Sequence, residues 1–139
     1  MASEYEECYS NSTWSRPPCS QENRVTISMF NQDFCQFLAD IQVKYNNIIA
    51  AGDFNIHIND ITNNDAQVFV ELMESAGFNQ HVTSPTHKAG NTLDHVYNER
   101  GSEVVVQSCD TRDFISDHCM INCVLNVPKE NKDNYMQKV

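Results

Sequence analysis

The stretch NIIAAGDFN at residues 47–55 decides the fold class, because it passes from a helix-breaking asparagine to a buried strand and then to a polar turn. The apolar run at residues 48–51 has the length and composition of a short buried strand. Asp53 and Asn55 follow it, and because side chains alternate along an extended backbone they should point to the same side. The stretch therefore predicts a strand that ends in two polar side chains facing one way.

One amphipathic helix is predicted before this strand in the sequence, and another is predicted after it. The first runs from Met29 to Tyr45, where apolar residues recur at spacings of three and four. Thr26 or Ser28 is available to cap its amino end. The second covers residues 65–76, where large apolar residues again gather on one face. Both helices should pack an apolar face against the strand.

Asn64 is placed to cap the second helix, and Gly77 is placed to end it. Short runs rich in apolar residues then predict more strands, at residues 78–82, 93–97, 104–107 and 119–127. Helices and strands alternate at first, and strands then follow one another directly. We therefore expect the α/β class, with a mixed β-sheet and helices packed on one side.

Length and charge limit what the chain can be. Its 139 residues carry 19 acidic and 9 basic side chains, a formal net charge of −10. Nucleic acid is held mainly by Lys and Arg on phosphates, so no broad basic face for DNA is expected. We divide the chain into an irregular acidic arm (residues 1–13), one domain (14–127) and a polar tail (128–139).

Cysteine usage and hydropathy indicate the cellular setting. The six cysteines form no CxxC pair, so we expect reduced thiols and no zinc site. No basic leader with an apolar stretch is present, and no apolar run approaches the ~18 residues of a membrane span. We expect an intracellular protein of the nucleus or cytoplasm, without a signal peptide or transmembrane segment.

Three polar segments lie next to the predicted strands: GDFN at 52–55, NTLDHV at 91–96 and SDH at 116–118. Each alone is ordinary turn sequence, and each of the five histidines is by itself more often structural than catalytic. Their occurrence together, in order and each beside an apolar run, favours one functional site.

The residue types in these segments suit the hydrolysis of a phosphodiester, which needs an activated water and stabilised charge on phosphate. Asp53 can take a proton while the Asn55 amide orients the water. His118 is the natural acid, and Asp94 is our candidate for the carboxylate that orients it and raises its pKa. Asp117 is a hard oxygen ligand suited to Mg²⁺.

At these residues the chain resembles the endonuclease/exonuclease/phosphatase superfamily, which includes apurinic endonucleases. The endonuclease domains of non-LTR retrotransposons are the most similar members. The stretches that carry the resemblance are RPP at 16–18, the helix from Met29, IIAAGDFNIH at 48–57, FNQHVTSPTHKAGNTLDHVY at 78–97, and SDH.

The resemblance implies a four-layer α/β sandwich that uses Mg²⁺, or Mn²⁺, to hydrolyse phosphodiester bonds of DNA. Carried over by motif, it implies that Asp53 is the base that activates water and that Asn55 is its orienting partner. It implies that Asp94 is the carboxylate that holds the histidine, Asp117 a carboxylate of the metal site, and His118 the group that contacts the scissile phosphate. The predicted catalytic residues are therefore Asp53, Asn55, Asp94 and His118, and the predicted metal ligands are Asp117 and Asp53.

The resemblance covers only the second half of the family domain. The family's first half, with an active-site Asn and a metal-binding Glu, has no counterpart here, so we expect a truncated domain. Three functions stay open: a Mg²⁺-dependent DNA endonuclease, a non-catalytic remnant that binds a partner, and a phosphatase for small phosphoesters. Exposed strand edges also predict self-association.

Overall fold

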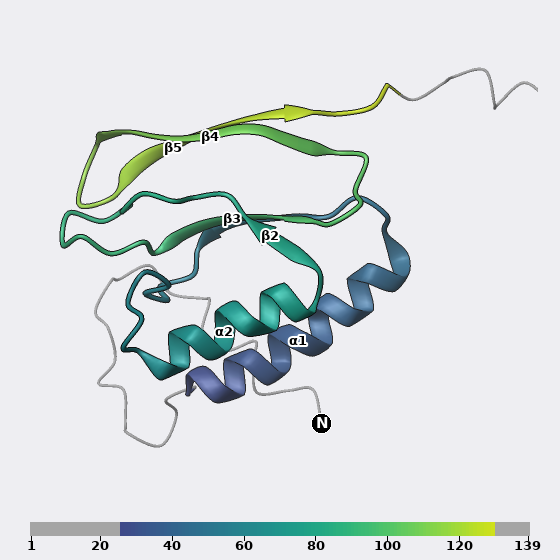
Figure 1. The fold of residues 1–139 in the computed structure, drawn as a ribbon, viewed down its shortest axis with the longest axis horizontal. Coiled ribbons are helices and arrows are strands. Elements are labelled where there is room, and N and C mark those ends of the chain that lie inside the picture. Colours follow the sequence, from purple (N-terminus) through teal and green to yellow (C-terminus); the bar gives the residue numbers. More distant parts are fainter. Residues whose placement is uncertain (1–25, 130–139) are drawn as a thin grey trace, which may run out of the picture.

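The computed structural model describes residues 26–129, and within them two helices and five strands form three layers (Figure 1). Both helices lie on one face of a three-stranded sheet, and a two-stranded sheet lies over its other face. The predicted acidic arm at residues 1–13, the RPP motif at 16–18 and the tail from residue 130 onward lie outside the described residues.

The first predicted helix is confirmed as α1, Ile27–Lys44. Its cap is Thr26, whose hydroxyl oxygen accepts a hydrogen bond of 3.2 Å from the backbone N–H of Met29. This bond satisfies one of the amide groups that every helix leaves free in its first turn. The helix therefore begins shortly before the apolar periodicity that predicted it.

The second predicted helix is confirmed as α2, Asn64–Ser75. Its cap is Asn63 and not Asn64, because the Asn63 side chain accepts a hydrogen bond of 3.1 Å from the backbone N–H of Ala66. Gly77 follows the helix with a φ of 87°, a left-handed conformation that glycine adopts at little cost. The glycine stop predicted from the sequence is thus present.

The first sheet has the order β1-β3-β2 and contains Ile49–Asp53 (β1), Phe78–Gln80 (β2) and Asp94–Glu99 (β3). Both outer strands pair antiparallel with β3. β1 and β2 therefore run in the same direction, but β3 separates them. The α/β class is confirmed, whereas the expected mixed sheet is wrong for the described strands, because β3 takes the place where a parallel neighbour would pair.

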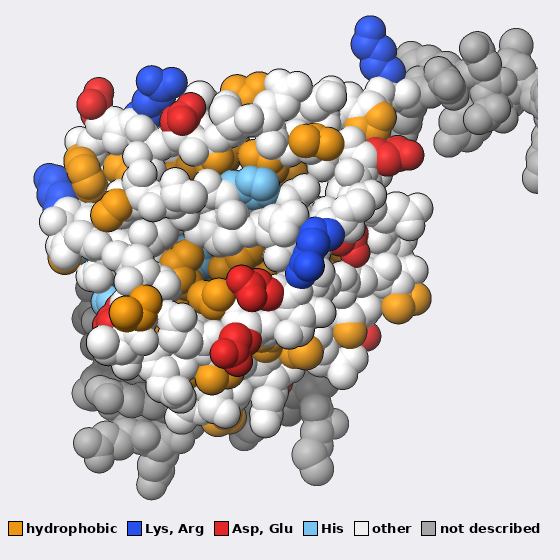
Figure 2. Space-filling view, in the orientation of Figure 1, with side chains coloured by type: hydrophobic (Ala, Val, Ile, Leu, Met, Phe, Trp, Pro, Cys, Tyr) orange, Lys and Arg blue, Asp and Glu red, His pale blue; other side chains and the backbone are white. Residues whose placement is uncertain are grey.

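The second sheet consists of β4, Val105–Phe114, and β5, Cys119–Asn126, in antiparallel pairing. β4 continues well beyond the apolar run that predicted it, through a polar segment that hydrogen bonding to β5 holds extended. Cys119, Ile121 and Cys123 line the space between the sheets, whereas Met120 and Val124 are exposed. Figure 2 shows hydrophobic side chains at the surface over this sheet.

The core lies between the helices and the first sheet. Its buried members are Leu38, Ile48, Ile56, Ala66, Phe69, Met73, Phe78 and Tyr97. β3 is buried at four successive positions, from His95 to Asn98. A strand buried at successive positions is covered on both faces, as the middle layer of the molecule must be. β3 is thus a firm base for Asp94, its first residue.

Candidate functional site

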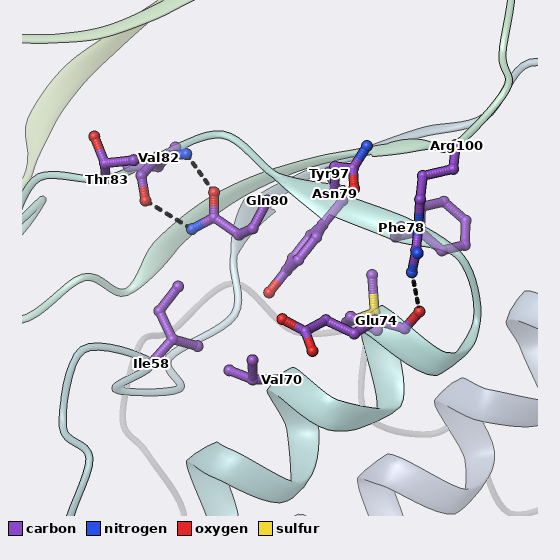
Figure 3. A pocket seen from close by; sticks show the side chains of 11 residues that line it. Ile58, Val70, Glu74, Phe78, Asn79, Gln80, Val82, Thr83, Tyr97 and Arg100 are labelled. Atoms are coloured by element: carbon purple, nitrogen blue, oxygen red, sulfur yellow. Dashed lines mark hydrogen bonds between the residues drawn. The ribbon is translucent and has the colours of Figure 1, made fainter.

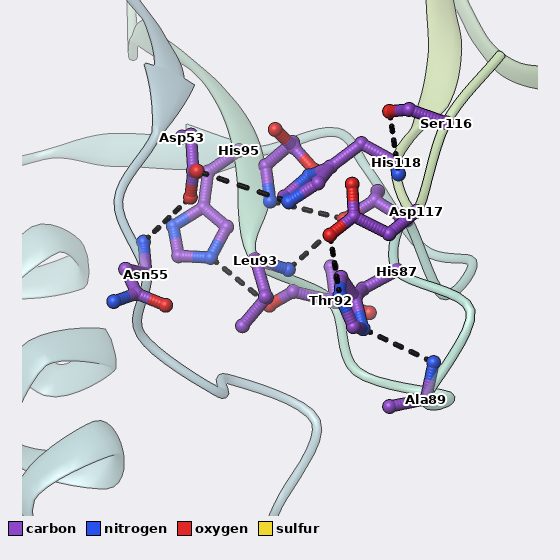
Figure 4. Close-up of polar contacts among 12 residues, drawn as sticks. Asp53, Asn55, His87, Ala89, Thr92, Leu93, His95, Ser116, Asp117 and His118 are labelled. Carbon is purple, nitrogen blue, oxygen red and sulfur yellow. Dashed lines mark hydrogen bonds and ion pairs between the residues drawn. The ribbon is translucent and has the colours of Figure 1, made fainter. Parts of the chain in front are cut away.

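The predicted site residues converge at one end of the two sheets, as Figure 4 shows. Asp53 is the last residue of β1 and Asp94 is the first of β3, and the two are direct cross-strand partners. Directly opposed side chains in an antiparallel pair lie close together. Pairing therefore places two carboxylates side by side, although they are far apart in the sequence.

His118 precedes β5 and reaches across to both carboxylates. Its Nδ1 lies 2.8 Å from Oδ2 of Asp94, and its Nε2 lies 4.0 Å from Oδ2 of Asp53. Because a carboxylate can only accept, Nδ1–H donates to Asp94. This hydrogen bond is the main cause that raises the pKa of His118 above its ordinary value, and burial opposes it. The imidazolium form is therefore favoured.

Asn55 does not lie as the sequence predicted. Its φ of 53° is left-handed, so the chain turns there and is no longer extended. Its backbone N–H donates a hydrogen bond of 2.9 Å to Oδ1 of Asp53. The alternation argument fails at this position, and Asn55 holds the Asp53 carboxylate through its backbone instead of its amide. The exposed amide makes no hydrogen bond within residues 26–129.

Asp117 lies beside His87, a histidine for which the sequence favours a structural role. Nε2 of His87 is 3.6 Å from Oδ2 of Asp117, and the rings of His87 and His118 meet edge to face with centroids 5.1 Å apart. The pKa of Asp117 is lowered, first by its own backbone N–H and then by the Ser116 hydroxyl. No periodicity or motif in the sequence distinguishes His87 from the other histidines.

Thr86 is a second residue that sequence reasoning missed. It is fully buried, and its hydroxyl oxygen accepts hydrogen bonds of 3.0 Å from the backbone N–H groups of Leu93 and Asp94. Its carbonyl oxygen accepts another, of 2.8 Å, from the N–H of Cys119. Thr86 thus ties the start of β3 to the start of β5, and so fixes Asp94 relative to His118.

His95, next to Asp94 in the sequence, is structural. Its Nε2–H is shared between the carbonyl oxygens of Ile56 and Thr92, at 3.1 and 3.2 Å. Its ring stacks on Phe54 with centroids 5.0 Å apart. Burial lowers the pKa of His95, so the neutral ring is favoured. Neighbouring strand positions face opposite sides, which explains why Asp94 reaches the site and His95 enters the core.

Two groups of side chains could hold a metal ion, and His118 belongs to both. One contains Asp53 and Asp94, the other His87 and Asp117, and within each group the ligand atoms lie within 4.8 Å of one another. Mg²⁺ uses one or two carboxylates and keeps several waters, so exposed carboxylates fit its needs. The two predicted metal ligands, Asp53 and Asp117, lie on two sides of the His118 ring (Figure 4).

A cavity of about 440 Å³ between the two sheets borders Asp53 and Asp94. A larger one, of about 510 Å³, lies beside β2 and α2 (Figure 3), but two of its polar side chains, Gln80 and Arg100, are bonded to neighbouring backbone and its lining contains no histidine. The Gln80 amide bonds the backbone of Val82, and the Arg100 guanidinium donates to the carbonyl oxygen of Glu74. The smaller cavity, beside the paired carboxylates and histidine, is therefore the better candidate.

Comparisons with models of protein families, with curated proteins and with solved structures found no match to this chain. Neither helix within residues 26–129 is long and apolar enough to cross a membrane.

Proposed function

We propose that this chain hydrolyses phosphodiester bonds in a reaction assisted by a divalent cation, with DNA as the substrate class. The observation that carries the proposal is His118, which bonds one carboxylate through Nδ1 and faces a second, Asp53, through Nε2. An imidazole oriented on one nitrogen and free on the other can donate a proton or a hydrogen bond to a phosphate oxygen.

The charges around the ring support this role. Asp94 favours the protonated ring, as the raised pKa of His118 indicates. An imidazolium would stabilise negative charge that develops on the phosphate. Asp53 is exposed, so water can reach its carboxylate and give a proton to it, and its Oδ2 lies 4.0 Å from Nε2 of His118. The proposed acid, His118, and the proposed base, Asp53, thus lie next to each other.

The metal would be held by Asp53 or by Asp117, exposed carboxylates that lie on the two sides of His118 and belong to different groups of possible ligands. Bound there, Mg²⁺ or Mn²⁺ would supply charge neutralisation at the non-bridging oxygens of the phosphate. The order of layers, helices then sheet then sheet, supports assigning the described residues to half of the four-layer sandwich of the endonuclease/exonuclease/phosphatase superfamily.

The small number of basic side chains determines the ionic strength at which activity should be measured. Lys and Arg side chains are scattered over the face in Figure 2 and form no patch there, and the net charge is −10. Few phosphate contacts mean weak binding that salt weakens further. Nicking of supercoiled plasmid should therefore be measured at low ionic strength, with Mg²⁺ titrated against the wild-type chain.

The variants that decide the proposal are Asp53→Ala and His118→Ala, with His57→Ala as a matched control outside the site. We expect the wild type and His57→Ala to nick at the same Mg²⁺-dependent rate, and the two site variants to lose about 100-fold or more. Equal background nicking in all four proteins would contradict the proposal and favour the non-catalytic remnant. Hydrolysis of p-nitrophenyl phosphate without plasmid nicking would indicate the small-phosphoester phosphatase.

A further inference from the structure

The loop before β3 is joined to the segment that carries Asp117 and His118 by a short stretch of antiparallel pairing. The N–H of Lys88 donates to the carbonyl oxygen of Asp117, and the N–H of Cys119 donates to that of Thr86, both at 2.8 Å. His87 lies between these two bonds and is the bridge partner of His118. Backbone pairing with the segment that carries His118 therefore holds the His87 side chain at the site.

The ring nitrogens of His87 have different roles. Nδ1 lies 3.0 Å from the backbone nitrogen of Ala89, whose N–H can only donate, so Nδ1 must accept. In a neutral ring the proton then sits on Nε2, the nitrogen that faces Asp117 at 3.6 Å. A metal ligand needs its coordinating nitrogen unprotonated. His87 is thus arranged as a donor toward Asp117 and not as a ligand for a cation.

Asp117 needs such a partner. Its side chain is 67 % exposed, and His87 is the basic side chain within ion-pair distance among the described residues. A free exposed carboxylate samples several rotamers, and ordering one on binding a cation costs conformational entropy. The approach of Nε2 to Oδ2 at 3.6 Å adds a basic partner to the backbone N–H of Asp117 and the Ser116 hydroxyl. A carboxylate has about four acceptor positions, so one remains for a cation.

We propose that His87 is a positioning residue, which uses its Nε2–H to orient the Asp117 carboxylate toward a divalent cation. The inference rests on the proposed function for the identity of the cation site, and it adds a residue to which the sequence assigned no role. The role corresponds to the outer partners that orient ligating groups at metal sites, whose loss weakens metal binding.

The test is Mn²⁺ binding to the full chain without substrate, measured by electron paramagnetic resonance of the free ion. His87→Phe keeps an aromatic ring against His118 but removes the donor, and His87→Gln restores an N–H near the position of Nε2. We expect His87→Phe to weaken Mn²⁺ binding by about 10-fold or more. His87→Gln and the control His57→Phe should stay close to the wild type.

Unchanged binding in His87→Phe would overturn the proposal, and so would an equal loss in His87→Phe and His87→Gln or no Mn²⁺ binding by the wild type. If His87→Phe fails to fold, nitrogen NMR of the wild type decides the matter, because a proton on Nδ1 of His87 contradicts the donor role. Mn²⁺ binding with this pattern but no plasmid nicking would reject the phosphodiesterase and keep the inference about His87.

Discussion

The two sheets differ in how they are supported. The first sheet packs its central strand between the helices and β4–β5, and Phe69 on α2 is fully buried beneath it. Within residues 26–129, β4–β5 has cover on one face only, and Met120 and Val124 are 50 % and 44 % exposed. The site takes Asp53 and Asp94 from the first sheet, and Asp117 and His118 from the turn that joins the two strands of the second. Its geometry therefore depends on the contacts that join them.

The largest expected effect is a difference in stability between a substitution in the core beneath the first sheet and one on the exposed face of β4–β5. Phe69→Ala should lower the free energy of unfolding by about 3–5 kcal/mol, because it leaves a cavity among closely packed rings. Met120→Ala should change it by less than about 1 kcal/mol, since the side chain is half exposed. Urea unfolding followed by circular dichroism measures both, and similar losses would show that β4–β5 has its own core.

The next effect concerns the bond that crosses from one sheet to the other. Asp94→Asn keeps the shape but removes the charge that favours the imidazolium of His118. We expect plasmid nicking to fall about 100-fold, with Asp113→Asn on β4 unchanged. A matching loss in Asp113→Asn would attribute the effect to charge in general and not to the pairing with His118.

The seam, by which we mean the contacts of residues 86–88 with residues 117–119, can be weakened without replacing a predicted site residue. Thr86→Val keeps the side-chain volume but removes the hydroxyl that accepts from Leu93 and Asp94. Two buried N–H groups then lose a partner, and unfolding should become easier by about 1–3 kcal/mol. Thr83→Val, at an exposed position of the same loop, is the control. Stability equal to that of the control would mean that the seam is held by backbone pairing alone.

Two histidines should respond to pH in opposite directions. The pKa of His118 is raised above 6.5, so its stabilising contribution is complete below pH 6.5 and disappears as pH rises through the folded-state pKa. The pKa of His95 is lowered, so its contribution is complete above pH 6.5 and is lost as pH falls toward the folded-state pKa. NMR titration of the two rings tests this, and two midpoints at 6.5 would contradict it.

The smallest effect is a difference in thiol reactivity. Burial first, and then the facing thiol of Cys123, raise the pKa of Cys109 on β4. The thiolate is the reactive form, so iodoacetamide should modify Cys109 more slowly than the exposed Cys35 on α1 at pH 8. Mass spectrometry of digested protein gives both rates. Equal rates would indicate that the space between the sheets is open to solvent.

The sequence predicted elements where local pattern is strong and failed where distant contacts decide. Apolar periodicity identified both helices, but only hydrogen-bond geometry selects Asn63 over Asn64 as a cap. The polar half of β4 is extended because β5 pairs with it, and no local signal predicts that. The mixed sheet was wrong because sequence order does not reveal that β3 inserts between β1 and β2.

The site divides in the same way. The sequence by itself determined which side chains we propose for the chemistry, because Asp53, Asp94, Asp117 and His118 lie in or next to apolar runs that are recognisable as strands. The sequence also indicated Asp94 as the candidate partner of His118, and the two side chains bond at 2.8 Å. Only the tertiary structure decided that Asn55 turns away from the extended backbone, and that Thr86 and His87 belong to the seam. The physical reason is that strand pairing brings residues together across long stretches of chain, whereas sequence patterns report only local backbone preference and burial.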